Sequence, residues 1–455
     1  MQNSLPIVGS WWLPNNYRKR ISGKLFIDDI NGLCLELNGH LLDSNILRQS
    51  FGVPLDFING KSINHNEITL KDSVLISFSR NSSKYKVYAC FSGITFNKLN
   101  DIRFNVVNVS FRHLNKWVMN HFFDDDMNTI LSTKKASLGL RLEPIDLGRI
   151  SNFNLRIKIN KLSQVYKNEI TGFQYSSALE ISTEKPRLFD EFLEISIKFS
   201  SFLSFATLQP ALISEMDGVI HHKRKKYNCV DILLRFREFE DSEDSSANYY
   251  GLIPFQFIEE KISQVINKYF ELVKTYDSVY DLYLSSIINP STVIDNEFRN
   301  LVEGLEAYHR RRLPGKYVSN DDFRREVLPR LIEAIPCELD RSFKEKLSNS
   351  MEYMNEYSLR KRITELIRNL PKDLNLKIQK ESGYREDIIR NIVLIRNHFA
   401  HFDPEEKRYI PKDAISLQLL NEEMRLILEA NILADLGIDV EYINKLIRIP
   451  KRFHH

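Results

Sequence analysis

Cysteine is scarce in this sequence, and the few cysteines lie far apart. They stand at Cys34, Cys90, Cys229 and Cys337, and no two of them form a CxxC pair. This spacing argues against a disulfide framework and against a zinc knuckle. It is typical of a protein from a reducing compartment, and we expect no metal site.

Long apolar runs are absent as well. Phe199–Ile213, a stretch of 15 residues without a charged side chain, is rich in serine and threonine. It is too short and too polar to cross a bilayer. The sequence does not open with a basic segment followed by an apolar one, so it shows no signal peptide. We expect a cytoplasmic protein without a membrane partner.

An excess of charge of one sign is also missing. The net charge is +3; residues 1–250 carry 31 Lys and Arg against 27 Asp and Glu, and residues 251–455 carry 32 against 33. Indiscriminate binding to nucleic acid is therefore not expected, and any RNA contact must come from local patches. A chain of 455 residues exceeds the size at which one core usually stops growing, so two domains are expected.

The first part of the sequence has the pattern of β-strands. Gly23–Asp28 and Leu33–Leu37 flank Asn31-Gly32, a pair that tolerates the positive φ values of a tight hairpin turn. Further strands are expected at Val74–Ser79, Tyr85–Phe91, Leu138–Leu142 and Phe153–Ile159. We expect an antiparallel β-rich domain over residues 1–212, a sandwich or distorted barrel of about eight strands.

Helical spacing of apolar residues begins near residue 186 and runs from Leu188 to Ala206, with Pro210 as a stop. Lys223–Lys226 and the acidic, serine-rich run Glu238–Ser246 follow. Such runs without apolar periodicity are typical of exposed loops or linkers. We therefore expect residues 213–254 to bridge two domains.

Residues 255–455 are expected to be all-helical, because apolar stripes at helical spacing recur between helix breakers. The expected helices are Phe257–Tyr276, Val279–Ile288, Ser291–Arg312, Asp321–Ala334, Arg341–Glu356, Leu359–Leu370, Arg385–His401 and Ala414–Leu436. The fold class is therefore α+β and multidomain, with a β-rich domain followed by a helical bundle.

The helix Arg385–His401 carries the residues of greatest interest. Its apolar stripe includes Ile388, Ile392 and Ile395, and a neighbouring row runs from Ile389 through Val393 to Arg396. An arginine thus takes a place where an apolar residue would continue the buried edge. Asn397 and His401 are four residues apart and share one side of the helix.

This trio suits cleavage of RNA. A histidine at a helix C-terminus lies in the negative end of the helix dipole, which favours a pKa near neutrality and general acid–base work. Arginine offers a planar fork for phosphate oxygens. RNA supplies its own nucleophile, the 2′-hydroxyl. The alternative is a structural helix end, in which His401 caps the last carbonyls and Arg396 pairs with a carboxylate.

The spacing of Arg396, Asn397 and His401 resembles the arginine–(four to six residues)–histidine signature of the HEPN ribonuclease superfamily. As in that superfamily, these residues lie near the end of a helical domain. The stretch Phe298–Arg311, together with Gly9–Pro14, is similar to the ApeA-type anti-phage proteins. The resemblance covers most of the chain.

The resemblance implies a metal-independent endoribonuclease without cofactors, with Arg396, Asn397 and His401 as catalytic residues and 2′,3′-cyclic phosphate products. It implies a composite site across a homodimer formed through the helical domain. It also implies abortive infection, in which a toxin-like nuclease attacks host RNA, including tRNA. The β-rich domain would then sense a phage-derived trigger or restrain the nuclease.

Other polar residues carry two interpretations each. Glu306, His309 and His398 are candidates for lining the site, and ordinary ion pairs or core positions are the alternatives. Arg310, Arg311 and Arg312 are candidates for binding the RNA backbone, as is Arg360–Arg362, and a solvated face is the alternative. Trp11 and Trp12 fit a core or a recognition edge.

A second function stays open at the level of the sequence. The helical domain would be a non-catalytic RNA- or protein-binding HEPN module, and the β-rich domain would carry out recognition. Substitution of His401 distinguishes the two, because only the nuclease loses an activity.

Overall fold

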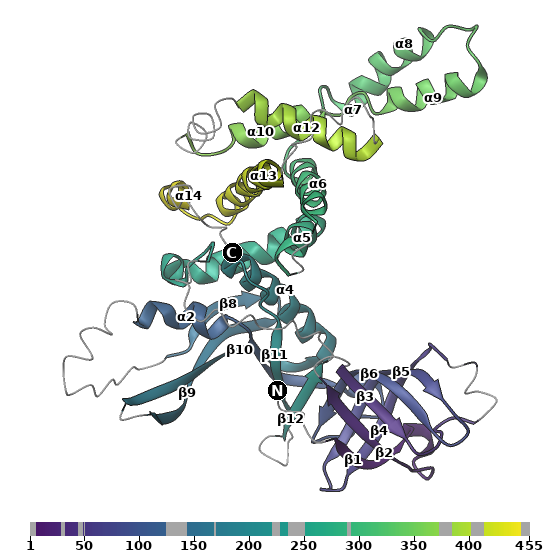
Figure 1. Cartoon of the computed structure of the whole chain (residues 1–455), viewed down its shortest axis with the longest axis vertical. Helices are drawn as coiled ribbons and strands as arrows, with labels where there is room; N and C mark the ends of the chain where they lie inside the picture. The colour runs from purple at the N-terminus through teal and green to yellow at the C-terminus, as the bar shows by residue number, and fades with distance from the viewer. Residues whose placement is uncertain are drawn as a thin grey trace. The chain divides into compact units, whose positions relative to one another are not determined.

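The computed structural model describes residues 6–28, 32–43, 49, 51–123, 143–167, 170–220, 228–234, 251–288, 293–372, 385–401 and 414–446. The chain divides into two compact units, residues 1–267 (the β unit) and residues 268–455 (the helical unit) (Figure 1). This order confirms the expected fold class of a β-rich part followed by a helical part.

Six strands of the β unit close into an antiparallel barrel, in the ring order β3-β2-β1-β4-β5-β6 and back to β3. They are β1 (Ile7–Trp12), β2 (Ile21–Asp28), β3 (Gly32–Leu37), β4 (Pro54–Ser62), β5 (Glu67–Phe78) and β6 (Ser83–Ser92). The hairpin predicted around Asn31-Gly32 is β2 and β3, which pair antiparallel from Gly23↔Leu37 to Asp28↔Gly32. Closure between β3 and β6 removes the open edges that a flat sheet would expose.

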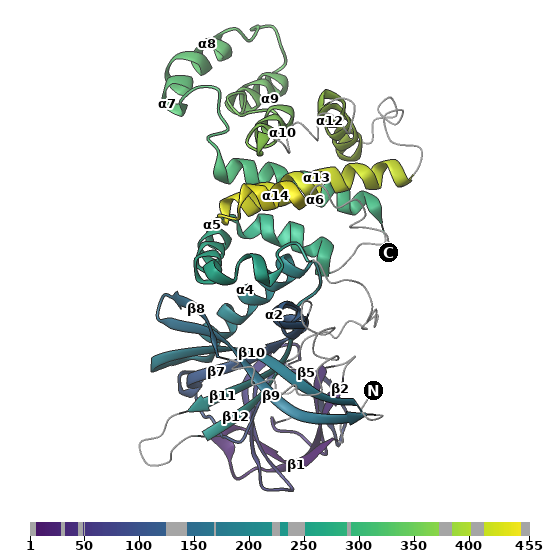
Figure 2. The same ribbon diagram turned by 90° about the vertical axis from the view of Figure 1, so that its left-hand side faces the viewer.

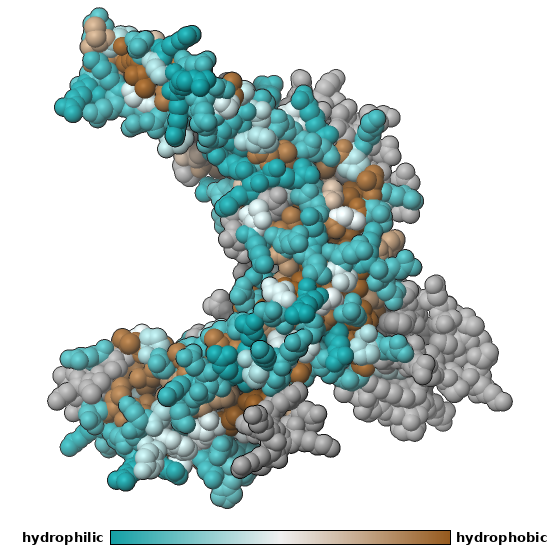
Figure 3. Space-filling view, turned by 180° about the vertical axis from the view of Figure 1, so that it is seen from behind, coloured by the Kyte–Doolittle hydropathy of each residue, from teal (hydrophilic) through white to brown (hydrophobic). Residues whose placement is uncertain are grey.

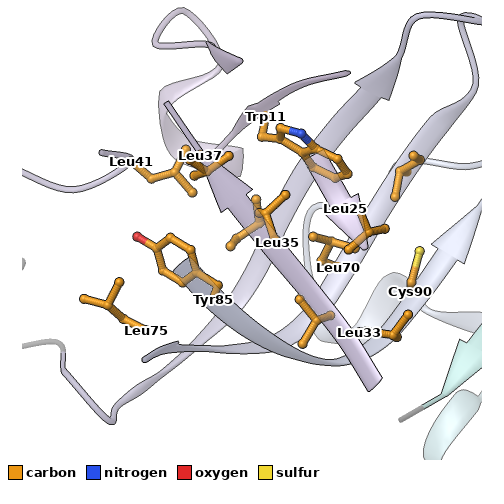
Figure 4. Packing of buried hydrophobic residues seen from close by; sticks show 13 residues of the cluster. Trp11, Leu25, Leu33, Leu35, Leu37, Leu41, Leu70, Leu75, Tyr85 and Cys90 are labelled. Carbon is orange, nitrogen blue, oxygen red and sulfur yellow. The ribbon is translucent and has the colours of Figure 1, made fainter. Parts of the chain in front are cut away.

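The barrel holds a tightly packed apolar core (Figure 4). Trp11 is fully buried there, together with Leu25, Leu35 and Tyr85. A Cβ on Gly60 would lie 2.3 Å from Cε3 of Trp11, so only glycine allows β4 to approach the indole this closely. Of the two interpretations of Trp11, the core position is therefore confirmed.

Beyond β6 the sheet continues through six further strands in the order β12-β11-β7-β10-β9-β8. These are β7 (Arg103–Phe111), β8 (Ile145–Ile150), β9 (Phe153–Lys167), β10 (Ile170–Leu188), β11 (Ile213–Ile220) and β12 (Asn228–Leu234). Helices α2 (Leu114–Phe123) and α4 (Phe189–Thr207) pack on β7 and β10. The sequence predicted α4 closely, whereas the expected strand Leu138–Leu142 lies outside the described residues.

The expected boundary at residue 212 differs from the one in the structure. Strands β11 and β12 fall in the segment expected to bridge two domains, yet β11 pairs with β7 and β12 pairs with β6. The indole Nε1 of Trp117 donates a 2.7 Å hydrogen bond to the carbonyl of Ile253, so this residue too belongs to the β unit. The acidic run Glu238–Ser246 lies outside the described residues.

The helical unit is built around helices that pack on one another, and Figure 2 shows α6 beside α13. Its elements are α5 (Ile262–Ile288), which begins in the β unit, α6 (Ile294–Arg312), α7 (Asn320–Asp322), a π-helical turn (Phe323–Val327), α8 (Leu328–Glu333), α9 (Arg341–Glu352), α10 (Leu359–Arg368), α12 (Arg385–His401), α13 (Ala414–Asp435) and α14 (Val440–Leu446). The segments expected as two helices, Phe257–Tyr276 and Val279–Ile288, are largely one helix, α5.

Candidate active site

Helix α12 has the bounds that the sequence predicted, Arg385 to His401. Ile388, Ile392 and Ile395 are buried, and the helix packs against α6 and α10. Their spacing of four and three residues keeps these side chains on one face. The buried stripe therefore fixes which side of α12 is turned to solvent.

Arg396 lies on the solvent side of α12. The row through Ile389 and Val393 predicted a buried edge, and Ile389 is buried and Val393 half-buried, but Arg396 is exposed. Successive positions seven apart drift around a straight helix, and a long arginine side chain reaches water easily. The expected buried-edge position is therefore corrected to an exposed one.

The Nη1 of Arg396 donates a 3.4 Å hydrogen bond to Oδ1 of Asn397. Within the described part of the chain Arg396 forms no ion pair with a carboxylate. The structural alternative of an arginine paired with an acidic neighbour therefore has no counterpart among these residues. Among the described residues, Asn397 is thus the one hydrogen-bond partner of the guanidinium, whose other donors suit a phosphate.

His401 is the last residue of α12, and its backbone is one helical turn beyond Asn397. A separation of four residues places the two on the same side of the helix. The imidazole of His401 lies outside the part that the structure describes. Its proposed proton-transfer role stays a prediction.

His398 lies on the inner side of α12. The residue is 9% exposed, and its ring centroid lies 6.0 Å from that of Phe399. The position is that of a core histidine beside an aromatic ring.

Phe399 joins α12 to α6. Its ring meets the ring of Phe298 edge-on at a centroid distance of 5.5 Å. The guanidinium carbon of Arg299 lies 5.0 Å from the same ring centroid. Neither contact was foreseen from the sequence, where Arg299 was only part of a stretch that resembled a family.

His309 belongs to a different cluster. It is fully buried, with Nε2 at 2.8 Å from Oε2 of Glu365 and Nδ1 at 3.1 Å from Nη1 of Arg362. A guanidinium has no acceptor, so Nδ1 must accept and the Nε2–H must donate to Glu365. Burial lowers the pKa of His309, and the charge of Arg362 adds to this effect against the raising effect of Glu365. The imidazole is therefore neutral, with both nitrogens engaged.

Arg362 is the centre of this cluster and is only 2% exposed. Besides His309, it donates to the carbonyl of Tyr357 at 3.0 Å and to Oε2 of Glu356 at 3.4 Å. A Cβ on Gly315, whose φ is +65°, would lie 2.7 Å from Nη1 of Arg362. The interpretation of Arg360–Arg362 as a basic surface patch is therefore wrong for its last residue.

Glu306 accepts two hydrogen bonds from Arg310, at 3.2 Å from Nε and 2.9 Å from Nη2. Arg310 also pairs with Glu356. No hydrogen bond or ion pair of the described residues joins Glu306 or His309 to Arg396 or Asn397. The structure thus separates these candidates into two groups.

The three arginines at the end of α6 differ from one another. Arg310 is held by Glu306 and Glu356, and the Nε of Arg312 donates to Asp435 at 2.9 Å. Arg311 is exposed and has no ion pair with any described residue. Of the three, Arg311 alone has its charge unmatched within the described chain.

Two further observations bear on the chemistry. Among the residues that the structure describes, no three His, Cys, Asp or Glu side chains gather as they would around a metal ion. In the same part of the chain, no helix is both long and apolar enough to cross a membrane.

Comparison with known families confirms the resemblance drawn from the sequence. The family model described as ApeA N-terminal domain 1 matches residues 6–269, and the model described as Apea-like HEPN matches residues 299–442. Arg396, Asn397 and His401 fall within the second match. No curated protein and no solved structure matches the chain.

Proposed function

The chain belongs to the ApeA family, with an ApeA N-terminal domain and an Apea-like HEPN domain, and we propose that it is an abortive-infection defence protein whose HEPN domain is a metal-independent endoribonuclease. One observation supports this most directly. Arg396 is exposed near the end of α12, five residues before His401; it is hydrogen-bonded to Asn397 and forms no ion pair with a described carboxylate. That arrangement leaves a guanidinium available to phosphate.

In the proposed reaction the 2′-hydroxyl oxygen attacks the neighbouring phosphorus. The bond from that phosphorus to the 5′-oxygen of the next nucleotide breaks, which leaves a 2′,3′-cyclic phosphate and a 5′-hydroxyl. An imidazole of His401 accepts the proton of the 2′-hydroxyl, and a second imidazole gives a proton to the departing 5′-oxygen. The Arg396 guanidinium stabilises the charge that develops on the non-bridging oxygens, and Asn397 holds Arg396 in place.

The motif supplies one histidine per chain, and we assign the second imidazole to the His401 of another copy, so the proposed enzyme is a homodimer with a composite site. The arm, residues 318–354 with α7, the π-helical turn, α8 and α9, supports a contact between copies. The structure describes all of it, and Phe323 is its single buried side chain. Ile332 and Phe343 are 41% and 46% exposed. Apolar residues reach the surface of this arm (Figure 3, upper left).

The charge of the arm also suits a second copy. It carries 8 acidic and 6 basic residues, so neither a polyanion nor a strongly basic partner is favoured. A two-fold contact needs a surface that complements itself, with an apolar centre and mixed charges around it. Exposed apolar side chains and charges of both signs on the arm support such a contact.

The β unit is the proposed sensor of a phage-derived trigger. A hollow of about 390 Å³ lies on the outside of its barrel, lined by Pro54, Asp72, Val74, Ile76, Lys86, Val87 and Tyr88. Its lining is mostly apolar with one charge of each sign, as in sites that bind a peptide or another small ligand. The proposed target is host RNA, with tRNA as the first to test.

Cells that express the wild-type chain or the His401→Ala variant provide the test. After phage challenge, sequencing of RNA 5′ ends should show new cleavage sites in the wild type and none in the variant, at equal protein levels. An unchanged RNA profile in the wild type would contradict the nuclease and would favour a non-catalytic binding module.

A further inference from the structure

Arg299 stands out among the charged residues of α6. Its guanidinium lies over the ring of Phe399 on α12, 5.0 Å from the centroid, and the residue is exposed. Phe298, next to it in the chain, is fully buried and contacts the same ring edge-on. The ring of Phe399 thus contacts the buried ring of Phe298 and the exposed guanidinium of Arg299.

No described carboxylate pairs with the charge of Arg299. Asp295 and Glu303 lie one turn away on either side, and neither forms an ion pair with it. Other arginines near α6 are matched instead: Arg310 by Glu306 and Arg425 by Glu297. An arginine that the fold holds in place without neutralising is suited to an anionic ligand.

The contact with the Phe399 ring, whose centroid lies 5.0 Å from the guanidinium carbon, restricts how the guanidinium is presented. Stacking on an aromatic face occupies the plane of the guanidinium and leaves the N–H groups at its edge free. That edge matches the two oxygens of a phosphate, which a planar fork binds through two parallel hydrogen bonds. Because the ring already restricts the side chain, less conformational freedom is lost on binding.

Phe399 and Arg396 are three residues apart on α12 and are therefore neighbours on its surface. The contact with this ring therefore ties Arg299, 97 positions earlier in the sequence, to a residue one helical turn from Arg396. We propose that Arg299 binds a phosphate of the RNA adjacent to the one that Arg396 contacts. This inference rests on the proposed ribonuclease function, and it assigns Arg299 to substrate binding.

The expected effects follow from that role. Arg299→Ala should raise KM about tenfold, the loss typical of a hydrogen-bonded charge contact, and leave kcat within about twofold. Loss of one phosphate contact to single-stranded RNA should also reduce the slope of log binding constant against log salt by about 0.7. Arg299→Lys keeps the charge without the fork and should fall between wild type and Arg299→Ala.

The test uses the full-length chain with two readouts. Steady-state cleavage of total tRNA gives KM and kcat, and binding of a fluorescently labelled single-stranded RNA to the His401→Ala background gives the salt slope. Arg368→Ala is the matched control, because Arg368 on α10 is exposed and has neither an ion pair nor a ring contact with any described residue. Circular dichroism and thermal melting establish folding, and Arg299→Gln replaces Arg299→Ala if the latter does not fold.

A raised KM with a reduced salt slope in Arg299→Ala, and neither change in Arg368→Ala, supports the proposal. Unchanged KM and slope in an enzyme that cuts RNA overturns the assignment of Arg299 and leaves the proposed function intact. If the wild type cuts no RNA while Arg299→Ala still weakens RNA binding, the nuclease is contradicted and the phosphate contact stands.

Discussion

Arg362→Met tests whether the buried cluster around Arg362 holds the base of the arm. Methionine keeps much of the length and the apolar stem of arginine while it removes every hydrogen-bond donor. The substitution leaves Nδ1 of His309 and the carbonyl of Tyr357 without their partner at 3.1 Å and 3.0 Å. It also leaves Glu356 with Arg310 alone.

The magnitude follows from these losses. An unsatisfied buried acceptor costs about 1–3 kcal/mol, and two of them remain. Relief from burying a charge and the apolar contacts of methionine offset part of this cost. We expect the free energy of unfolding of the helical unit to fall by about 2–4 kcal/mol.

Denaturant unfolding measures the loss, and hydrogen exchange shows where it arises. The base of the arm is joined by hydrogen bonds from Tyr317 N to Asn355 O at 3.0 Å and from Tyr357 N to Gly315 O at 2.8 Å. These two amides should exchange faster in Arg362→Met. Arg360→Ala, an exposed neighbour on the same helix, is the control with an expected change below about 0.5 kcal/mol. Equal stability of Arg362→Met and Arg360→Ala would refute the reasoning.

Two further predictions concern pH and assembly. Burial, together with the neighbouring charge of Glu422, raises the pKa of Glu423 from 4.5 to about 7, so the folded state binds this proton more tightly than the unfolded chain. The contribution of this proton to the free energy of unfolding is fully present below pH 4.5 and is lost as the pH rises through about 7. Over that range the Glu423→Gln protein should therefore lose about 2 kcal/mol less stability than the wild type, after allowance for partial exposure. Parallel stability–pH curves of the two proteins would contradict this. Ile332→Asp and Phe343→Asp should weaken the proposed dimer at least about tenfold in analytical ultracentrifugation, because each buries a charge in an apolar contact. Lys346→Glu on the same arm is the control, and an unchanged dimer in both apolar variants would exclude the arm as the contact.

Local patterns were enough to predict several elements. The Asn31-Gly32 turn identified the β2–β3 hairpin, because its conformational demands lie within adjacent residues. The stripe of Ile388, Ile392 and Ile395 identified α12 and its bounds, since burial on one face repeats at helical spacing. In both cases the signal and the structure share the same short segment.

The pairing of strands that lie far apart in the chain could not be predicted from the sequence. Closure of the barrel depends on contacts between β3 and β6, and no local pattern records which strands meet. Strands β11 and β12 lie near charged runs, so the sequence of this segment has the pattern of a linker, whereas its strands pair with β7 and β6.

The polar residues, too, could be predicted where the pattern is local and could not where the contact joins distant segments. The arginine, asparagine and histidine of α12 are within one helix end, so spacing and resemblance were enough to predict them as a site, and their roles stay a prediction. His309 looked like a candidate for lining the site because its partner Arg362 is 53 positions away and the sequence gives no sign of the pair. Arg299 was missed for the same reason, since its ring partner Phe399 comes from another helix. The only signal in the sequence was the pair of apolar residues Phe298 and Phe399, of which the first precedes Arg299 and the second lies three residues after Arg396.

The central claim is that the end of α12 cleaves RNA through the 2′-hydroxyl. The most direct measurement incubates purified wild-type, Arg396→Ala and His401→Ala proteins with tRNA in excess chelator and identifies the chemical ends of the products. The account predicts 2′,3′-cyclic phosphate and 5′-hydroxyl ends from the wild type, and at least about a hundredfold slower cleavage by each folded variant. Products that need added Mg²⁺, or equal cleavage by the His401→Ala protein, would contradict it.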